Sequence, residues 1–165
     1  MQCRILDHES VLSLLPDRDP WGHKGCFGRI LLLCGSKGYT GAAYFSAMGA
    51  LRSGAGLVFL GVPESIYAIE AVKLNEPVVF PLPDEGGMLS REAIPEILER
   101  LPRMDAVLVG CGLGRSCGVD ETVWEVLRHT ENPVVLDADG INALEGHIDV
   151  LDARRGRVTI LTPHD

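Results

Sequence analysis

Residues 23–56, HKGCFGRILLLCGSKGYTGAAYFSAMGALRSGAG, contain the strand, turn and helix around which we expect the whole fold to be built. Ile30 to Leu33 form an unbroken run of large aliphatic residues, which is typical of a strand buried on both faces of a parallel sheet. A turn with three glycines (residues 35–41) follows, and residues 42–53 repeat small side chains at helical spacing. Such a turn offers free N–H groups and the positive end of a helix dipole to an anion, most often a phosphate.

The alternative is that this turn only joins a strand to a helix, because glycine turns are common in α/β proteins and most bind no ligand. Two specific nucleotide-binding patterns also fail to match. A P-loop ends in Gly-Lys-Ser/Thr, whereas this turn ends in Thr40-Gly41-Ala42. The dinucleotide pattern G-x-G-x-x-G fails at its second glycine, where Lys37 stands. The turn by itself therefore leaves phosphate binding and a purely structural role both open.

The composition indicates one globular domain, expected to span residues 1–165. The chain has 165 residues, 46% of them hydrophobic and 23% charged, which is enough to bury a core. A net charge of −8 without any basic run argues against nucleic-acid binding. No apolar run approaches the roughly 20 residues that span a bilayer, and the N-terminal MQCRILDHES lacks the apolar segment of a signal peptide. We therefore expect a cytoplasmic protein with no membrane partner.

The cysteines favour the same compartment. Their number, 5, is odd, and no C-x-x-C pair occurs, so reduced thiols fit better than a disulfide framework or a zinc site. Cys34 ends the buried strand and is expected to be a small core residue. We expect no catalytic thiol.

Strands and helices alternate along the chain with short connections, which predicts an α/β fold with a mostly parallel sheet covered by helices on both faces. Because ligands bind outside the carboxyl ends of parallel strands, the segments that follow four of these strands are candidate site elements. They are residues 35–41, 110–114, 137–142 and 162–165. The last strand, residues 158–161, has no helix after it, so we expect an incomplete fold at the C-terminus or an edge covered by another subunit.

Five segments, in this order, resemble the ADP/ATP-dependent NAD(P)H-hydrate dehydratase family of the ribokinase-like superfamily. They are LPDRDPWGHKGCFGRILLLCGS (15–36), GAAYFSAMGALRSGAGLV (41–58), DAVLVGCGLGR (105–115), PVVLDADGIN (133–142) and ILTPH (160–164). The resemblance implies repair of hydrated NADH or NADPH, with ADP or ATP as phosphoryl donor and Mg²⁺ as cofactor. The ring hydroxyl is phosphorylated and then eliminated as phosphate. It also implies a ribokinase-like fold, of which this chain is the N-terminal portion, and we expect a homo-oligomer.

Carried over by position, the resemblance implies that Ala42, Gly112 and His164 contact the hydrated substrate. Asp137 and Asn142 match a segment near the nucleotide and metal region. For the aspartates at 137 and 139, N-capping of the short helix that follows is the alternative that the residues themselves favour. The turn of residues 35–41 then becomes a substrate-recognition element rather than a catalytic one.

The sequence departs from the family pattern in two places. Cys111 stands where the family commonly has Pro, and the chain ends T-P-H-D where the family continues T-P-H-P-G-E. The family's G-T-G-D segment, with its anion hole and catalytic base, has no counterpart in these 165 residues. No catalytic residue and no metal ligand is therefore assigned here, and we expect the chain alone to be inactive.

Two other functions stay open. One is a small-molecule kinase of the same superfamily, acting on a vitamin precursor or a sugar, because the shared fold cannot separate the two activities. The other is a non-catalytic nucleotide-binding or assembly fragment whose apolar edge is covered by self-association.

Overall fold

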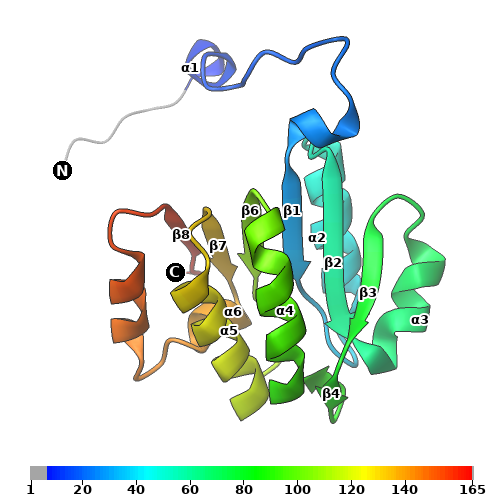
Figure 1. The fold of residues 1–165 in the computed structure, drawn as a ribbon, viewed down its shortest axis with the longest axis vertical. Coiled ribbons are helices and arrows are strands. Elements are labelled where there is room, and N and C mark those ends of the chain that lie inside the picture. Colours follow the sequence, from blue (N-terminus) through cyan, green and yellow to red (C-terminus); the bar gives the residue numbers. More distant parts are fainter. Residues whose placement is uncertain (1–6, 165) are drawn as a thin grey trace.

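A single parallel sheet carries the fold in the computed structural model, which describes residues 7–164 (Figure 1). Its strands follow the order β3-β2-β1-β6-β7-β8. They are β1 (Arg29–Leu33), β2 (Leu57–Pro63), β3 (Val78–Leu82), β6 (Ala106–Val109), β7 (Val134–Asp137) and β8 (Thr159–Thr162). A small antiparallel hairpin, β4 (Asp84–Glu85) and β5 (Met88–Leu89), stands apart from this sheet.

The helices are α1 (His8–Leu12), α2 (Thr40–Arg52), α3 (Glu64–Lys73), α4 (Ile94–Arg100), α5 (Cys117–His129) and α6 (Asp139–Asn142). Helices α4 and α5 cover one side of the sheet and α2 and α3 the other, as predicted, whereas α1 lies away from the sheet (Figure 1) and has no buried residue. Short 3₁₀ turns occur at Lys24–Phe27, Arg91–Ala93, Leu101–Arg103 and Ile148–Arg154. None of the helices within residues 7–164 is both long and apolar enough to cross a lipid bilayer.

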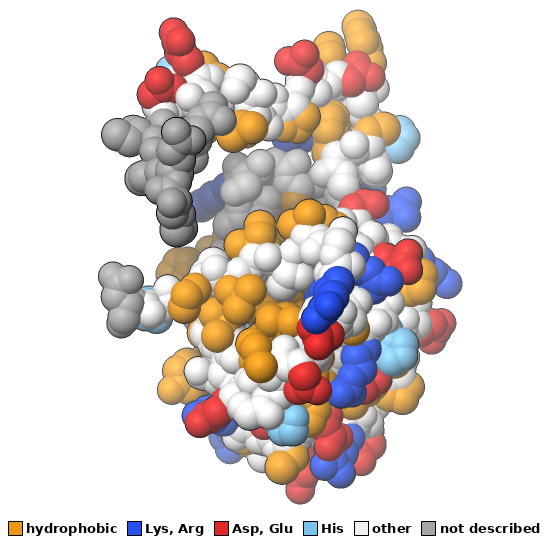
Figure 2. Space-filling model, turned by 90° about the vertical axis from the view of Figure 1, so that its left-hand side faces the viewer, with side chains coloured by type: hydrophobic (Ala, Val, Ile, Leu, Met, Phe, Trp, Pro, Cys, Tyr) orange, Lys and Arg blue, Asp and Glu red, His pale blue; other side chains and the backbone are white. Residues whose placement is uncertain are grey.

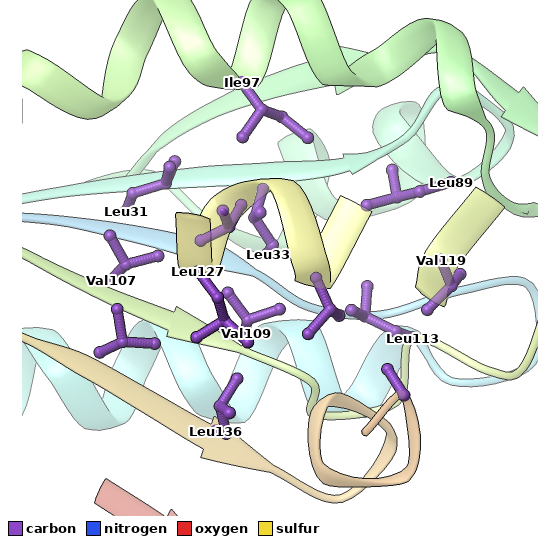
Figure 3. Packing of buried hydrophobic residues seen from close by; sticks show 14 of the residues in the cluster. Leu31, Leu33, Leu89, Ile97, Val107, Val109, Leu113, Val119, Leu127 and Leu136 are labelled. Carbon is purple, nitrogen blue, oxygen red and sulfur yellow. The ribbon is translucent and has the colours of Figure 1, made fainter. Parts of the chain in front are cut away.

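Strand β1 is buried on both faces, which confirms the prediction from its aliphatic run. Leu31 and Leu33 point into the core under α4 and α5 (Figure 3), whereas Leu32 and Cys34 point into a second core under α2 and α3. All four side chains are fully inaccessible to solvent. This alternation follows from the two-residue repeat of a strand, and β1 lies inside the sheet between β2 and β6.

The order of the strands reverses at β1. The chain runs outward from β1 through β2 to β3 and then returns to place β6 on the other side of β1. In an open parallel sheet, the segments that follow the two strands on either side of such a reversal run in opposite directions. A crevice therefore opens outside the carboxyl ends of these two strands. Here those strands are β1 and β6.

One helix boundary differs from the prediction, whereas the uncovered edge of the sheet agrees with it. Helix α2 begins at Thr40, two residues earlier than expected. At the far edge, β8 leaves apolar side chains accessible, with Ile160 51% and Leu161 38% exposed. Figure 2 views the molecule from this side and shows apolar side chains gathered in one area.

Candidate functional site

The four candidate segments lie along one edge of the sheet. They follow β1, β6, β7 and β8, which are consecutive neighbours and all parallel, so their carboxyl ends point the same way. We call this row the carboxyl edge; it comprises residues 35–42, 110–114, 137–142 and 162–164. Its arrangement agrees with the prediction from the sequence.

The turn after β1 and the turn after β6 are tied together by hydrogen bonds. Gly35 donates its backbone N–H to the carbonyl of Cys111 at 2.8 Å. The hydroxyl of Ser36, which is only 2% exposed, donates to the carbonyl of Gly112 at 2.8 Å. A buried polar side chain that bonds a backbone carbonyl in this way holds the two turns in a fixed relation.

Ala42 and Gly112, two of the residues that the resemblance assigns to the substrate, pack directly against each other beside the crevice. A Cβ placed on Gly112 would lie 2.7 Å from the Cβ of Ala42 and 3.0 Å from that of Tyr39. Gly112 also has a φ of +67°, a conformation that disfavours any residue with a side chain. Ala42 belongs to the first turn of α2, whose N-terminus has no side-chain cap, so free N–H groups lie close by.

The segment after β7 interlocks with the segment after β6. A Cβ on Gly110, which has a φ of +131°, would lie 1.8 Å from the carbonyl oxygen of Asp137. The Asp139 carboxylate accepts a hydrogen bond from the backbone N–H of Gly114 at 2.8 Å and another from the Asn142 amide at 3.2 Å. Asp139 therefore fixes the turn after β6.

The helix-capping interpretation of the two aspartates is wrong. The residue that caps α6 is Ala138, and no side chain makes a capping hydrogen bond there. Ala138 has a φ of +44°, a left-handed conformation that is strained in a residue with a Cβ. Such strain persists only where the surroundings hold the backbone in place, and here it lies between two candidate site residues.

Asp137 lies at the end of β7 beside the end of β8. Its carboxylate accepts a hydrogen bond from the Thr162 hydroxyl at 2.6 Å. This hydrogen bond lowers the pKa of Asp137 below its usual value, and hydrogen bonds from the Cys111 thiol and the Ala138 backbone, followed by the charge of His164, act in the same direction. His164 itself is exposed. Asp137 thus stays ionised at the carboxyl edge with His164 in electrostatic reach.

The sequence does not reveal that the hairpin of β4 and β5 packs against the carboxyl edge. The hairpin of β4 and β5 reaches the turn after β1, where Lys37 donates its backbone N–H to the carbonyl of Gly87 at 2.8 Å. On the same hairpin, Met88 contacts Gly114 and also lines a cleft of about 590 Å³ beside the start of α5. Residues 83–89 look like an ordinary exposed turn in the sequence, and no local signal reveals where they pack.

The HKG segment, residues 23–25, lies away from the carboxyl edge. His23 and Lys24 precede β1, at the opposite edge of the sheet from the glycine turns. The carbonyl of Lys24 packs directly on Gly56, where a Cβ would lie 1.8 Å from it. The HKG segment is therefore part of the scaffold beneath β1 and β2.

The described residues do not form a cage for a metal ion. Within residues 7–164 no group of three or more His, Cys, Asp or Glu side chains converges. Asp137 is engaged by Thr162, and Asp139 by Gly114 and Asn142. Mg²⁺ is usually held by one or two carboxylates together with water and substrate phosphates. No step is therefore assigned to a metal held by this chain alone.

Comparison with known sequences connects this chain to one family. The model of the NAD(P)H-hydrate dehydratase family matches residues 30–165. A bifunctional NAD(P)H-hydrate repair enzyme of Moorella thermoacetica is 41% identical over 162 residues, covering 98% of this chain and 30% of that protein. The ATP-dependent (S)-NAD(P)H-hydrate dehydratase of Vitis vinifera is 30% identical, covering 96% of this chain and 48% of that protein. The chain thus spans less than half the length of these relatives.

Solved structures agree with this assignment. A ribokinase-like superfamily protein of Enterococcus faecalis superposes with a TM-score of 0.80 at 22% identity, over 96% of this chain and 53% of that one, and it supports the fold alone. The ADP/ATP-dependent NAD(P)H-hydrate dehydratase of Bacillus subtilis, co-crystallised with ATP and Mg²⁺, has a TM-score of 0.65 at 30% identity, over 80% of this chain and 44% of that one. With a family match over most of its residues and this fold, the chain belongs to the NAD(P)H-hydrate dehydratase family.

Proposed function

We propose that this chain supplies the substrate-recognition side of an ADP/ATP-dependent NAD(P)H-hydrate dehydratase. The substrate is a reduced nicotinamide dinucleotide whose ring carries an added hydroxyl. An adenine nucleotide with Mg²⁺ supplies the phosphoryl group that turns this hydroxyl into a leaving group. The observation that carries the proposal is the contact between Ala42 and Gly112 at the crevice between β1 and β6.

In this proposal Ala42 and Gly112 form the wall against which the hydrated nicotinamide ring lies. Neither has a side chain beyond a methyl group, so backbone and ligand can approach closely. The uncapped N-terminus of α2 presents N–H groups and a positive dipole end to the anionic substrate. His164 completes the substrate contacts from the end of β8.

Asp137 and Asn142 lie toward the nucleotide in the same proposal. The lowered pKa of Asp137 keeps its carboxylate charged near neutral pH, as is needed for a group that orients a cation accompanying phosphates. Catalysis of phosphoryl transfer depends mainly on positioning and charge stabilisation. We therefore assign binding and orientation to these residues and no covalent step.

We further expect the 165-residue polypeptide to bind the substrate without turning it over, because no residue of it is assigned as catalytic base or anion hole. A coupled assay that follows ADP or ATP consumption with NADH hydrate tests this expectation. Robust turnover by the polypeptide alone would show that it is wrong. A cytoplasmic location and a homo-oligomeric state stay predictions, to be checked by cell fractionation and sedimentation.

The binding proposal is tested with Ala42→Leu, whose larger side chain would occupy the position proposed for the nicotinamide ring beside Gly112. Ala68→Leu serves as the control because Ala68 is exposed in the middle of α3. Thermal unfolding is measured with NADPH hydrate, with NADPH, and with small alcohols that a vitamin or sugar kinase would phosphorylate. We expect NADPH hydrate to raise the melting temperature of the natural chain and of Ala68→Leu, but not of Ala42→Leu. Stabilisation by an alcohol and not by the hydrate would favour the kinase alternative.

A further inference from the structure

Two cysteines distant in sequence meet beneath the crevice between β1 and β6. Cys34 follows β1 directly and is fully buried, whereas Cys111 follows β6 and is half-buried. The backbone hydrogen bonds on either side of Cys34, from Gly110 to Leu33 at 3.2 Å and from Gly35 to Cys111 at 2.8 Å, tie the two strand ends together. Both cysteines pack into the core under α2 and α3.

The backbone allows the two thiols to share one face of the sheet. In regular pairing, Cys111 would lie opposite Gly35 and would point away from Cys34. Gly110 interrupts this alternation with a φ of +131°, and Cys111 joins the cluster that contains Cys34. Neighbouring strands about 4.8 Å apart with an offset of one residue place the two Cα atoms about 6 Å apart, which is within the range of disulfides.

The surroundings of the two thiols favour ionisation of Cys111 and disfavour ionisation of Cys34. Hydrogen bonding from the Cys34 thiol, and then from the Ser46 hydroxyl, lowers the pKa of Cys111, and this outweighs burial and the nearby Asp137 carboxylate, which act in the opposite direction. The same interaction with Cys111, together with burial, raises the pKa of Cys34. A thiol that ionises more readily and is accessible to solvent reacts first with an oxidant, and a neighbouring thiol can then resolve the product.

We propose that Cys34 and Cys111 form a peroxide-sensitive dithiol that closes into a disulfide across the ends of β1 and β6. In the first step the Cys111 thiolate attacks hydrogen peroxide. An S–O bond forms, the O–O bond breaks, hydroxide leaves, and Cys111 becomes a sulfenic acid. In the second step the sulfur of Cys34 attacks the sulfur of Cys111. An S–S bond forms, the S–O bond breaks, and the hydroxide leaves as water with the proton of Cys34.

The chain provides its own controls, because Cys26 and Cys117 are exposed and separate from this pair. A background variant, Cys3→Ser/Cys26→Ser/Cys117→Ser, retains only the pair. It is treated with hydrogen peroxide, its remaining thiols are blocked with N-ethylmaleimide, and its mass and peptides are measured before and after dithiothreitol. We expect loss of two hydrogen atoms per chain, a linked peptide containing both cysteines, and full reversal by dithiothreitol.

Single changes within this background separate a true pair from ordinary oxidation. Cys111→Ser should leave Cys34 reduced, and Cys34→Ala should leave Cys111 as a sulfenic or sulfinic acid with a gain of oxygen. The proposal is overturned if the background variant gains oxygen without forming the linked peptide. It is equally overturned if the pair stays reduced under conditions that oxidise Cys26 and Cys117 in the natural chain.

A consequence for ligand binding rests on the proposed function and has its own measurement. The disulfide would join the two turns that carry Ala42 and Gly112, so we expect the oxidised background variant to bind NADPH hydrate at least several-fold more weakly than its reduced form. Equal affinities of the two forms would overturn this coupling. Absence of binding by the reduced form would overturn the proposed function and leave the disulfide test unaffected.

Discussion

Gly112→Ala tests the contact on which the proposed site depends. The new methyl group would lie 2.7 Å from the Cβ of Ala42, closer than two carbon atoms can approach without a shift of the backbone. Neither atom is the end of a flexible side chain. The overlap therefore has to be relieved by separating the turn after β6 from the start of α2.

Two costs add up in this variant. A side chain at a φ of +67° costs about 1–2 kcal/mol. Overpacking of a closely fitted contact adds about 1–3 kcal/mol. We therefore expect the free energy of unfolding to fall by about 2–5 kcal/mol. Gly156 has a φ of +81° with nothing within 4 Å of a new Cβ, so Gly156→Ala should carry only the first cost.

The overlap is isolated by a double-mutant cycle. Ala42→Gly removes the methyl group that Gly112→Ala would strike, so the two changes together should cost at least about 1 kcal/mol less than the sum of their separate effects. Urea unfolding is followed by far-UV circular dichroism, and the slopes of the transitions are compared to confirm that only stability has changed. If Gly112→Ala alone does not fold, the double variant should recover a cooperative transition.

The reasoning is refuted if the coupling energy stays below about 0.5 kcal/mol, which is the usual range for independent sites. It is also refuted if Gly156→Ala destabilises the chain as much as Gly112→Ala. Either result would mean that Ala42 and Gly112 do not touch, and the proposed wall for the nicotinamide ring would lose its support.

Three further changes test the rest of the carboxyl edge and its scaffold. Ala138→Gly relieves the left-handed strain at φ +44° and should raise the free energy of unfolding by up to about 1 kcal/mol, whereas Ala68→Gly in α3 should lower it by about 1 kcal/mol, both measured by urea unfolding. Thr162→Val removes the hydrogen bond that depresses the pKa of Asp137, so an NMR titration should show that pKa rising. A carboxyl group whose pKa is depressed in the folded state stabilises the fold above its unfolded pKa, and this stabilisation is lost as the pH falls through the folded pKa. The ionisation of Asp137 should therefore make the natural chain more stable than Thr162→Val near neutral pH, and this contribution should vanish in acid. Arg154→Lys should cost at least about 2 kcal/mol in urea unfolding, since Arg154 is 3% exposed and its guanidinium donates to three backbone carbonyls and a hydroxyl, which an ammonium group cannot replace.

Much of the fold could be predicted from local patterns. The aliphatic run at Ile30 to Leu33 predicts a strand buried on both faces, and the structure places alternate side chains in two cores. The glycine and aspartate segments after β1, β6 and β7 predict a single site edge, because parallel strands end on the same side. These predictions succeed because they depend on periodicity and chain direction, which neighbouring residues determine.

The partners of individual side chains could not be predicted in this way. Asp139 has the sequence context of a helix cap, yet it bonds the backbone of Gly114 in another turn. Ser36 is an ordinary residue of a glycine turn until its hydroxyl is found on the carbonyl of Gly112. Each of these contacts joins segments far apart in the chain, and local preference carries no information about them.

The turn at residues 35–41 shows which features the sequence determines and which only the tertiary structure decides. Its sequence determines that a buried strand ends, that the backbone turns on glycines, and that a helix with small side chains begins. Only the tertiary structure decides that this turn meets the one after β6, that Ala42 faces Gly112, and that Cys34 lies beside Cys111. The physical reason is that the neighbours of β1 depend on the return of the chain from β3 to β6. The burial of the two cores, and not any residue of the turn, determines the path of this return.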